Sequence, residues 1–596
     1  MTTLIADLEA NGLLDEVSKI HQITTIDADT GELHSYNGNN VIAGVQRLCD
    51  ADRIVGHNFI GYDIPAIRIV YAVEIDPRKV IDTLILSKLG NPDRPGGHTL
   101  ASWGERLGHP KVEHEDWETW SPEMEHRCNE DTRITHKVFE RLRPMLDQQP
   151  EAVAIEHEIA VRVEETVRRG FGLDVEACHR LVNQFLKERE AHLREFKSIF
   201  PPILVSPKPT SPTKRLKVIN KRSPYYGVME PGADFCPVVV QEFNPGSRQQ
   251  IAQRLVSKYN WVPKVYTNTG IPEVSEDTLR DLPYPEAQKF AAYLATEKKL
   301  SQINSEPKAN GYGGGWLHYE KNGRVHASLN SLKAVTGRMS CSSPNVQQVA
   351  SDPAMRAAWV PAPGHVLVGV DADGLELRCL GHYLSGYDGG EYANLVVHGD
   401  VHSKTMENVG FYDRNQVKRL TYGWLYGAGD AKLGTIALED AQKAGKEINY
   451  GVLGIERGKR TPSASTVGRA VRARLQGGFT GLSDLVAAVR AKAQTQGKLK
   501  GLDGRTLWAR SPHSALNLLL QSAGAIIVKK AWCLMDRDVR VVMQVHDEWQ
   551  VECSPEEADD IGGHVVSCVK KAGVDLGFRC ELAASYHIGA SWAETH

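Results

Sequence analysis

The chain has 596 residues, of which 41% are apolar and 24% charged, and its formal net charge is −4. This length predicts several domains, and this composition excludes global disorder. The charge excludes a uniformly basic coat for nucleic acid, so any such binding must use local clusters of Lys and Arg. The ten cysteines form no CxxC pair, which is typical of reduced thiols. No run approaches the ~18 apolar residues of a membrane span, and residues 1–10 lack the apolar core of a signal peptide.

Acidic residues near the start of the chain predict a metal-dependent nuclease site. Residues 4–11 are typical of a strand, in which Asp7 and Glu9 face the same side. Asp63 follows a second apolar run, and Asp131 lies in a helical pattern over 123–135. Four such carboxylates can hold two Mg²⁺ ions and activate water against a phosphodiester. The alternative for each acid taken singly is a solvated surface position.

The middle of the chain predicts long helices. Apolar residues recur at heptad-like spacing within 151–200, and helical patterns follow over 247–255 and 285–303. The last pattern carries Lys298 and Lys299, exposed cations that suit a sequence-independent grip on duplex backbone. A plain helical hairpin is the alternative.

Residues 201–244, between these helices, are rich in Pro and Lys and predict a loop insertion. Its first half is basic and lacks acids, with Lys208, Lys214, Arg215, Lys217, Lys221 and Arg222.

Two acidic segments in the second half predict a second metal site. The apolar run 365–370 reads as a buried strand that ends at Asp371, before a helical pattern from residue 375. Residues 540–545 and 549–553 predict a hairpin with His546, Asp547 and Glu548 at its tip. Aspartates that meet on one sheet can hold two Mg²⁺ ions about 3.5–4 Å apart, activate a 3′-hydroxyl and stabilise a leaving pyrophosphate. Taken alone, either segment is an ordinary turn or helix cap.

Between these segments, residues 414–426 predict a helix with a functional stripe. Arg414, Lys418, Tyr422 and Tyr426 recur every fourth residue and so share one face. Cations followed by aromatic rings can bind a triphosphate and stack a base. A solvated amphipathic helix, the alternative, has no need of tyrosines in line with the cations.

Segments 371–378, 414–426 and 546–548 resemble motifs A, B and C of the family A DNA polymerases. Their amino-acid sequences are most similar to those motifs in the replicative enzymes of short-tailed, T-seven-like bacteriophages. The four early acids resemble the DEDD 3′–5′ proofreading exonucleases. The resemblance implies a multidomain α+β and α/β fold with a ribonuclease H-like exonuclease domain and a right-hand polymerase domain. The implied boundaries are 1–146 for the exonuclease, 147–312 for the thumb with its insertion at about 201–244, 313–383 for the first part of the palm, 384–508 for the fingers and 509–596 for the rest of the palm.

The resemblance also implies roles for individual residues. Metal would lie on Asp371, the Ala372 carbonyl and Asp547, with Glu548 beside them, and on Asp7, Glu9 and Asp131, with Asp63 beside them. Each site would hold two Mg²⁺, with Mn²⁺ as a substitute. The implied nucleotide contacts are Glu376, His402, Arg414, Lys418, Tyr422 and Tyr426, and the implied DNA contacts are Arg338, Gln347, Lys298, Lys299, His513, Asn517, Gln521 and His546. Glu376 would bond Tyr422 and close the space that a ribose 2′-hydroxyl needs.

One position departs from the exonuclease pattern. Arg127 stands four residues before Asp131, where the family usually has a water-orienting Tyr. His126 stands five residues before Asp131, the spacing of the histidine subclass of these nucleases. Two interpretations stay open: His126 is the general base, or it is a surface residue and proofreading is weakened. In the same domain, Trp103 is predicted to be core.

The sequence therefore predicts a DNA-directed DNA polymerase with 3′–5′ exonuclease, acting on primer-template DNA and dNTPs in phage replication, in the cytoplasm of an infected bacterium. Helicase-primase and single-strand-binding protein are expected partners; the shortness of the insertion leaves a thioredoxin-type processivity factor open. A single-subunit RNA polymerase is the distant alternative, which Glu376 and the exonuclease motifs oppose. A nuclease or DNA-binding module with a structural polymerase half is opposed by complete motifs A, B and C.

Overall fold

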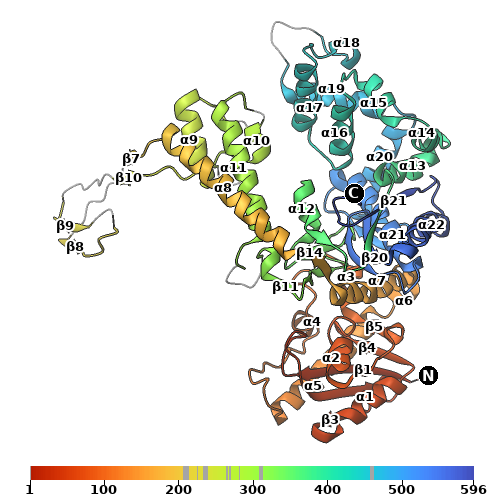
Figure 1. Cartoon of the computed structure of the whole chain (residues 1–596). Helices are drawn as coiled ribbons and strands as arrows, with labels where there is room; N and C mark the ends of the chain where they lie inside the picture. Colours follow the sequence, from red (N-terminus) through yellow and green to blue (C-terminus); the bar gives the residue numbers. More distant parts are fainter. Residues whose placement is uncertain are drawn as a thin grey trace. The chain divides into compact units, whose positions relative to one another are not determined.

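The computed structural model describes residues 2–205, 214–223, 226–232, 239–263, 266–267, 270–280, 282–307, 313–456 and 462–596. Its contacts divide the chain into two units. The first unit is Met1–Gly172, Arg324–Gln348 and Trp359–His596, and the second is Leu173–Gly323 and Val349–Ala358 (Figure 1). In the part of the chain that is described, no helix is long and apolar enough to cross a membrane.

The amino-terminal part of the first unit is built on a five-stranded mixed sheet of order β3-β2-β1-β4-β5. β1 is antiparallel to β2 and parallel to β4, which is parallel to β5. The strands are β1 (Thr3–Ala10), β2 (Ile20–Asp27), β3 (Leu33–Asn37), β4 (Arg53–Gly56) and β5 (Val80–Asp82). The helices around the sheet are α1 (Val41–Asp50), α2 (Asp63–Tyr71), α3 (Thr83–Gly90), α4 (Leu100–Arg106) and α5 (Pro122–Leu142). Trp103 of α4 is buried, as predicted.

The carboxyl-terminal part of the first unit contains a four-stranded antiparallel sheet of order β19-β20-β16-β21, here called the central sheet. Its strands are β16 (Val366–Ala372), β19 (Val541–Val545), β20 (Glu548–Cys553) and β21 (Ala584–Gly589). Helices α13 (Leu375–Asp388), α21 (Ala515–Leu534) and α22 (Ala558–Asp575) share its apolar core. The predicted strand ending at Asp371, the helix after it and the hairpin are all confirmed.

A helical subdomain follows α13 along the chain. It comprises α14 (Glu391–His398), α15 (Val401–Val409), α16 (Arg414–Leu425), α17 (Asp430–Lys443), α18 (Tyr450–Leu453), α19 (Ala464–Gly477) and α20 (Leu482–Gln496). The strand pair β17 (Lys498–Lys500) and β18 (Thr506–Trp508) then leads back to α21. The predicted helix over 414–426 is therefore confirmed as α16. The sequence also predicts a basic stretch over 457–474, whose first five residues lie outside the described ones.

The second unit is mainly helical. Its long helices are α8 (Val175–Ile199), α9 (Arg248–Tyr259) and α11 (Pro285–Ile303), joined in one apolar cluster by Phe196, Leu255 and Phe290. Within the predicted insertion, β7 (Ile203–Val205) pairs with β10 (Val239–Gln241), and β8 (Leu216–Val218) pairs with β9 (Gly227–Met229). Three-residue strands are too short for a period-two pattern to reveal them. Lys208, one of the predicted basic residues, lies outside the described residues.

Helix α7 (Pro150–Arg169) requires a correction to the predicted thumb of 147–312. It belongs to the first unit, not to the second. The reason is packing, because Ile155, Ile159 and Val163 join the core that contains Val368 and Val370 of β16. The heptad-like spacing correctly predicted a helix but could not show which neighbour its apolar face would meet.

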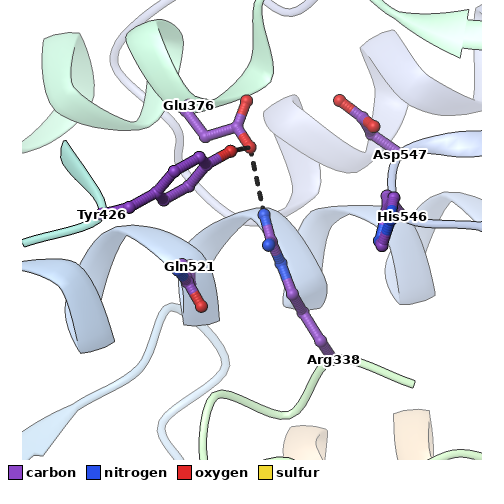
Figure 2. Close-up of a pocket in the computed structure, with 6 residues that line it drawn as sticks. All are labelled: Arg338, Glu376, Tyr426, Gln521, His546 and Asp547. Carbon is purple, nitrogen blue, oxygen red and sulfur yellow. Dashed lines mark hydrogen bonds and ion pairs between the residues drawn. The ribbon is translucent and has the colours of Figure 1, made fainter. Parts of the chain in front are cut away.

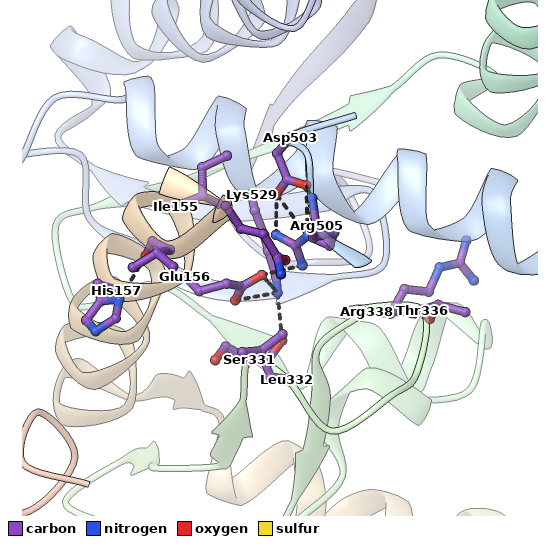
Figure 3. A network of polar contacts seen from close by, with 12 residues as sticks. Ile155, Glu156, His157, Ser331, Leu332, Thr336, Arg338, Asp503, Arg505 and Lys529 are labelled. Atoms are coloured by element: carbon purple, nitrogen blue, oxygen red, sulfur yellow. Dashed lines mark hydrogen bonds and ion pairs between the residues drawn. The ribbon is translucent and has the colours of Figure 1, made fainter. Parts of the chain in front are cut away.

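A buried ionic network links α7 to α21, one of the helices that share the apolar core of the central sheet (Figure 3). The Lys529 ammonium of α21 lies 2.7 and 2.8 Å from the two carboxylate oxygens of Glu156 and donates to the Ser331 carbonyl. The Arg505 guanidinium pairs with Glu156 at 2.7 Å and with Asp503 at 2.6 Å. Every charge has an opposite partner, which offsets the cost of removing it from water.

Candidate functional site

The central sheet brings together the acids that the sequence placed on two distant segments. Asp371 of β16 lies opposite Glu548 of β20 in the strand register, and the Ala372 amide donates to the Asp547 carbonyl at 3.2 Å. The hairpin closes on His546 and Asp547, and His546 has a φ of +56°. A two-residue hairpin needs such a left-handed residue to match the twist of its strands. These three acids, Asp371, Asp547 and Glu548, are called the central site below.

Burial and neighbouring acids raise the pKa of two carboxyls of the central site, Asp371 and Asp547. Partial desolvation and the charges of Asp547 and Glu548 raise the pKa of Asp371 to about 7. Burial and the charge of Glu376 raise the pKa of Asp547 to about 6. Carboxylates crowded in this way are stabilised by a divalent cation, and oxygen is the ligand atom that Mg²⁺ prefers.

Glu548 is enclosed by hydrogen bonds. Its carboxylate accepts from Trp592 Nε1 at 2.7 Å and from Gln550 Nε2 at 2.5 Å, and it lies 2.8 Å from His596 Nδ1. It is 3% exposed. These contacts hold the Glu548 carboxylate in place on the strand that pairs with Asp371.

A cavity of about 320 Å³ opens beside Asp547 and is lined by Arg338, Glu376, Tyr426, Gln521 and His546 (Figure 2). Glu376 accepts a 2.7 Å hydrogen bond from the Tyr426 hydroxyl and lies 3.0 Å from Arg338. This corrects the expected Glu376–Tyr422 bond. Tyr422 instead stacks on Tyr426, with ring centroids 6.4 Å apart. Because α16 ends at Leu425, the chain turns there and carries the Tyr426 hydroxyl to Glu376.

The expected triphosphate contacts gather where α15 and α16 begin. The Arg414 guanidinium bonds the Asp400 carboxylate at 3.1 and 3.2 Å, which holds the pKa of that carboxyl below its usual range. Lys418 is exposed one turn further on. His402 is buried and, among the described residues, its Nδ1 has no hydrogen-bond partner. Burial, with Arg414 and Lys418 nearby, lowers the pKa of His402.

The expected DNA contacts are spread over both units. In the first unit, Gln347 donates to the Gln544 carbonyl at 3.0 Å, and Asn517 donates to the Tyr426 carbonyl at 3.1 Å. His513 lies in a 3₁₀ turn directly before α21, and Asn517 and Gln521 lie on α21 itself. In the second unit, Lys298 is exposed on α11 and Lys299 pairs with Asp352.

A second acidic cluster, here called the amino-terminal site, forms on β1 and α5. Asp7, Glu9 and Asp131 each offer an oxygen, and these oxygens lie within 4.8 Å of one another. Asp63 is buried at the start of α2, and its charge helps to raise the pKa of Asp7. Burial and neighbouring acids raise the pKa of Asp7, and burial also raises those of Glu9 and Asp131.

Two cations, Arg127 and Lys111, lie among these acids, and neither was predicted to contact them. Arg127 Nε is 3.0 Å from Glu9 and 3.9 Å from Asp131. Lys111 Nζ is 2.5 Å from Asp131. His126 is exposed, whereas Arg127 lies one helical turn before Asp131 on the same face of α5. The four-residue spacing of Arg127 and Asp131 could have predicted their contact.

Other functional neighbours carried no local signal. Trp592 reaches Glu548 across 44 residues of sequence, and Lys529 reaches Glu156 across 373. Contacts at such separations follow from the tertiary fold, not from spacing.

Comparison with known proteins gives similarity along the whole chain. Residues 233–594 match the model of DNA polymerase family A. The chain is 30% identical over 727 aligned positions to the DNA-directed DNA polymerase of Enterobacteria phage T3, with all of both chains covered, and equally to that of Escherichia phage T7. It is 24% identical to DNA polymerase I of Aquifex aeolicus, covering 89% of this chain and 86% of that protein.

A solved structure shares the fold. The polymerase domain of Pol1 from M. smegmatis, in complex with DNA primer-template and dNTP, superposes with a TM-score of 0.72 at 17% identity. The superposition covers 100% of this chain and 95% of that one.

Proposed function

The chain belongs to DNA polymerase family A, and from that premise we propose that it extends DNA 3′ ends by two-metal-ion nucleotidyl transfer and proofreads at its amino-terminal site. The observation that carries the first part is the register of the central sheet, which sets Asp371 beside the Asp547 hairpin. Metal ions there would activate the primer 3′-hydroxyl and neutralise the leaving pyrophosphate. Asp371, Asp547 and the Ala372 carbonyl are the groups that would hold them.

The chain's own residues would position the incoming dNTP. Arg414 and Lys418 present cations to the triphosphate, and His402 has a ring nitrogen with which to bond it. Arg414 would exchange its intramolecular partner Asp400 for phosphate oxygens. Tyr422 and Tyr426 offer ring faces to the base, and Glu376 would exclude a 2′-hydroxyl from the cavity.

The primer and template would lie against the cavity that contains Arg338, Gln521 and His546. We assign Gln347, His513 and Asn517 to the same duplex, and Lys298 and Lys299 to its backbone. That the solved relative holds primer-template and dNTP supports these partners.

The proofreading part rests on the amino-terminal site. Its mixed sheet of order β3-β2-β1-β4-β5 fits the ribonuclease H-like assignment. The buried Asp131 Oδ1 has no hydrogen-bond partner among the described residues, so the donor set fits a cation. Asp7, Glu9, Asp63 and Asp131 would then support 3′–5′ hydrolysis. Arg127 in this site, together with the exposed position of His126, favours a slow exonuclease as the second candidate.

The similarity to two phage enzymes supports a role in copying a phage genome inside the infected bacterium. Helicase-primase and single-strand-binding protein would be its partners there. Extension of one primer on a long single-stranded circle, with and without bacterial thioredoxin, decides whether a processivity factor is needed.

Primer extension with Mg²⁺ and dNTPs tests the polymerase part. Asp371→Asn and Asp547→Asn should each lower kcat by about three orders of magnitude or more, because each removes a metal-holding charge. Degradation of single-stranded DNA by these variants should continue at the wild-type rate, whereas Asp7→Ala should abolish it and leave extension intact. Unchanged extension in the two Asn variants would refute the central site.

A further inference from the structure

The side chains of Arg127 and Lys111 place two positive charges inside the amino-terminal site. What they imply for metal binding rests on the proposed role of this site as the exonuclease. Arg127 Nε lies 3.0 Å from a Glu9 oxygen, and Lys111 Nζ lies 2.5 Å from Asp131 Oδ2. The two cations come from different segments: Arg127 from α5, and Lys111 from the chain between α4 and α5. They therefore approach the acids from separate parts of the backbone.

Arg127 is held in place by more than the acids. Its Nη1 donates to the Val112 carbonyl at 2.6 Å, and its guanidinium lies over the Trp117 ring, 4.9 Å from the centroid. Its side chain is 12% exposed. A guanidinium anchored on a carbonyl, a carboxylate and an aromatic face loses several contacts if it swings away. A binding cation would therefore have to fit beside Arg127.

One oxygen of Asp131 is left without a hydrogen-bond partner among the described residues. Asp131 Oδ2 receives Lys111, but Asp131 Oδ1 is buried and has no hydrogen-bond partner among the described residues. One oxygen from each of Asp7, Glu9 and Asp131 lies within 4.8 Å of the other two. A buried carboxylate oxygen without a partner is costly unless an ion or a water completes it.

Charge then limits how many divalent ions can enter. Asp7, Glu9, Asp63 and Asp131 supply four negative charges when ionised, and Arg127 and Lys111 offset two of them. One divalent cation makes the site neutral, whereas a second would leave two uncompensated positive charges among buried groups. We infer that the amino-terminal site holds a single divalent cation between Asp7 and Asp131, and that Arg127 and Lys111 supply the charge that a second ion would otherwise bring.

Manganese binding to the full chain tests this inference without relying on catalysis. In a background with Asp371→Asn and Asp547→Asn, which silences the central site, titration followed by electron paramagnetic resonance should count one tight Mn²⁺ with no coupling to a second. Asp131→Asn should remove that ion. Arg127→Gln should admit a second Mn²⁺, seen as a coupled pair, because it vacates the space and one positive charge.

Two further variants control the experiment. Arg133→Gln changes an exposed guanidinium of the same helix, which pairs with Glu130 at 3.3 Å, and should leave the count at one. Lys111→Met removes the other cation while leaving Arg127 in the chain, and it should also admit a second ion. Circular dichroism of each variant checks that it is folded.

Two tight, coupled Mn²⁺ ions in the wild-type site, or no Mn²⁺ that Asp131→Asn removes, would overturn the inference. So would a count of one in both folded Arg127→Gln and folded Lys111→Met. Degradation of single-stranded DNA is read separately. A single bound Mn²⁺ without degradation would refute the proposed exonuclease and leave the single-cation inference standing. Two bound ions with degradation would refute the single-cation inference and support the exonuclease.

Discussion

At the scale of single residues, Glu376 accepts the hydrogen bonds that hold Tyr426 and Arg338 together in one wall of the cavity. The Tyr426 hydroxyl and the Arg338 guanidinium both reach its carboxylate. Both donors reach the same oxygen, Oε1. A carboxylate held by two donors keeps its place when substrate binds, so it can exclude a hydroxyl by volume alone. The exclusion should fail when the carboxylate is removed and weaken when one of its anchors is removed.

We therefore expect Glu376→Ala to lower the preference for dNTPs over ribonucleotides by roughly one to two orders of magnitude. Tyr426→Phe keeps the ring and removes one hydrogen bond, worth about 1 kcal/mol at this partly exposed position, so the preference should fall about fivefold. The measurement is kcat/KM for single incorporation of each nucleotide type. Glu391→Ala, at the exposed start of α14, should leave the ratio unchanged, and an unchanged ratio in Glu376→Ala would rule out this role.

His382 of α13 predicts a pH effect on stability. Its ring stacks on Phe578 at 4.5 Å, and its Nδ1 accepts from the Arg579 amide at 3.0 Å. Burial and the Arg579 charge lower the pKa of His382 to about 4. At a pH below the ordinary His pKa, His382 binds a proton in the unfolded chain but not in the folded chain. Its contribution to stability is therefore present above pH 6.5 and is lost as the pH falls toward 4.

His382→Phe should remove that loss. Between pH 7 and pH 4.5 the free energy of unfolding of the wild type should fall by about 2 kcal/mol more than that of the variant. Urea unfolding at the two pH values measures the difference. Parallel pH profiles for the two proteins would show that His382 titrates normally.

At the scale of elements, α17 and α19 approach each other through two glycines. A Cβ on Gly434 would lie 1.7 Å from the Ala464 carbonyl oxygen, and one on Gly468 would lie 1.7 Å from the Asp430 carbonyl oxygen. Backbone cannot yield as a flexible side chain does, so either methyl group would push the helices apart. Asp430 also pairs with Arg472 across this contact at 2.7 Å.

Gly434→Ala and Gly468→Ala should each destabilise the protein by about 1–3 kcal/mol, although alanine favours the helix. They should also raise KM for dNTP, because α17 packs against α16. Gly477→Ala, where a Cβ meets nothing within 4 Å on the same α19, is the matched control and should be neutral or slightly stabilising. Thermal unfolding and steady-state kinetics measure both effects; wild-type melting in the first two variants would contradict the close packing.

At the scale of the whole molecule, a net charge of −4 makes DNA binding depend on a few placed cations. Lys298 is exposed on α11, and Lys289 of the same helix is paired with Glu195. Only a cation that meets phosphate releases counterions on binding.

Lys298→Ala should therefore weaken primer-template binding and reduce the slope of log Kd against log salt by about 1. Lys289→Ala should leave the slope unchanged, because its charge is engaged within the protein. Fluorescence anisotropy at salt concentrations from roughly 50 to 300 mM measures this slope. An unaltered slope in Lys298→Ala would remove it from the DNA-contacting surface.

Much of this protein could be predicted from local pattern. Alternation and apolar runs predicted the strands that carry Asp7 and Asp371, and four-residue spacing predicted α16 with its cationic and aromatic stripe. These features depend on backbone periodicity, which neighbouring residues determine. The family resemblance then supplied an expected role for each residue.

The tertiary structure alone decided which side chains meet. It joined Glu376 to Tyr426 instead of Tyr422, assigned α7 to the central core, and set Arg127 and Lys111 among the amino-terminal acids. The sequence determined where charges and apolar faces occur along each element. Which of them become neighbours depends on how a helix ends, which core its face enters and whether a buried charge finds a partner, and these are properties of the packed molecule.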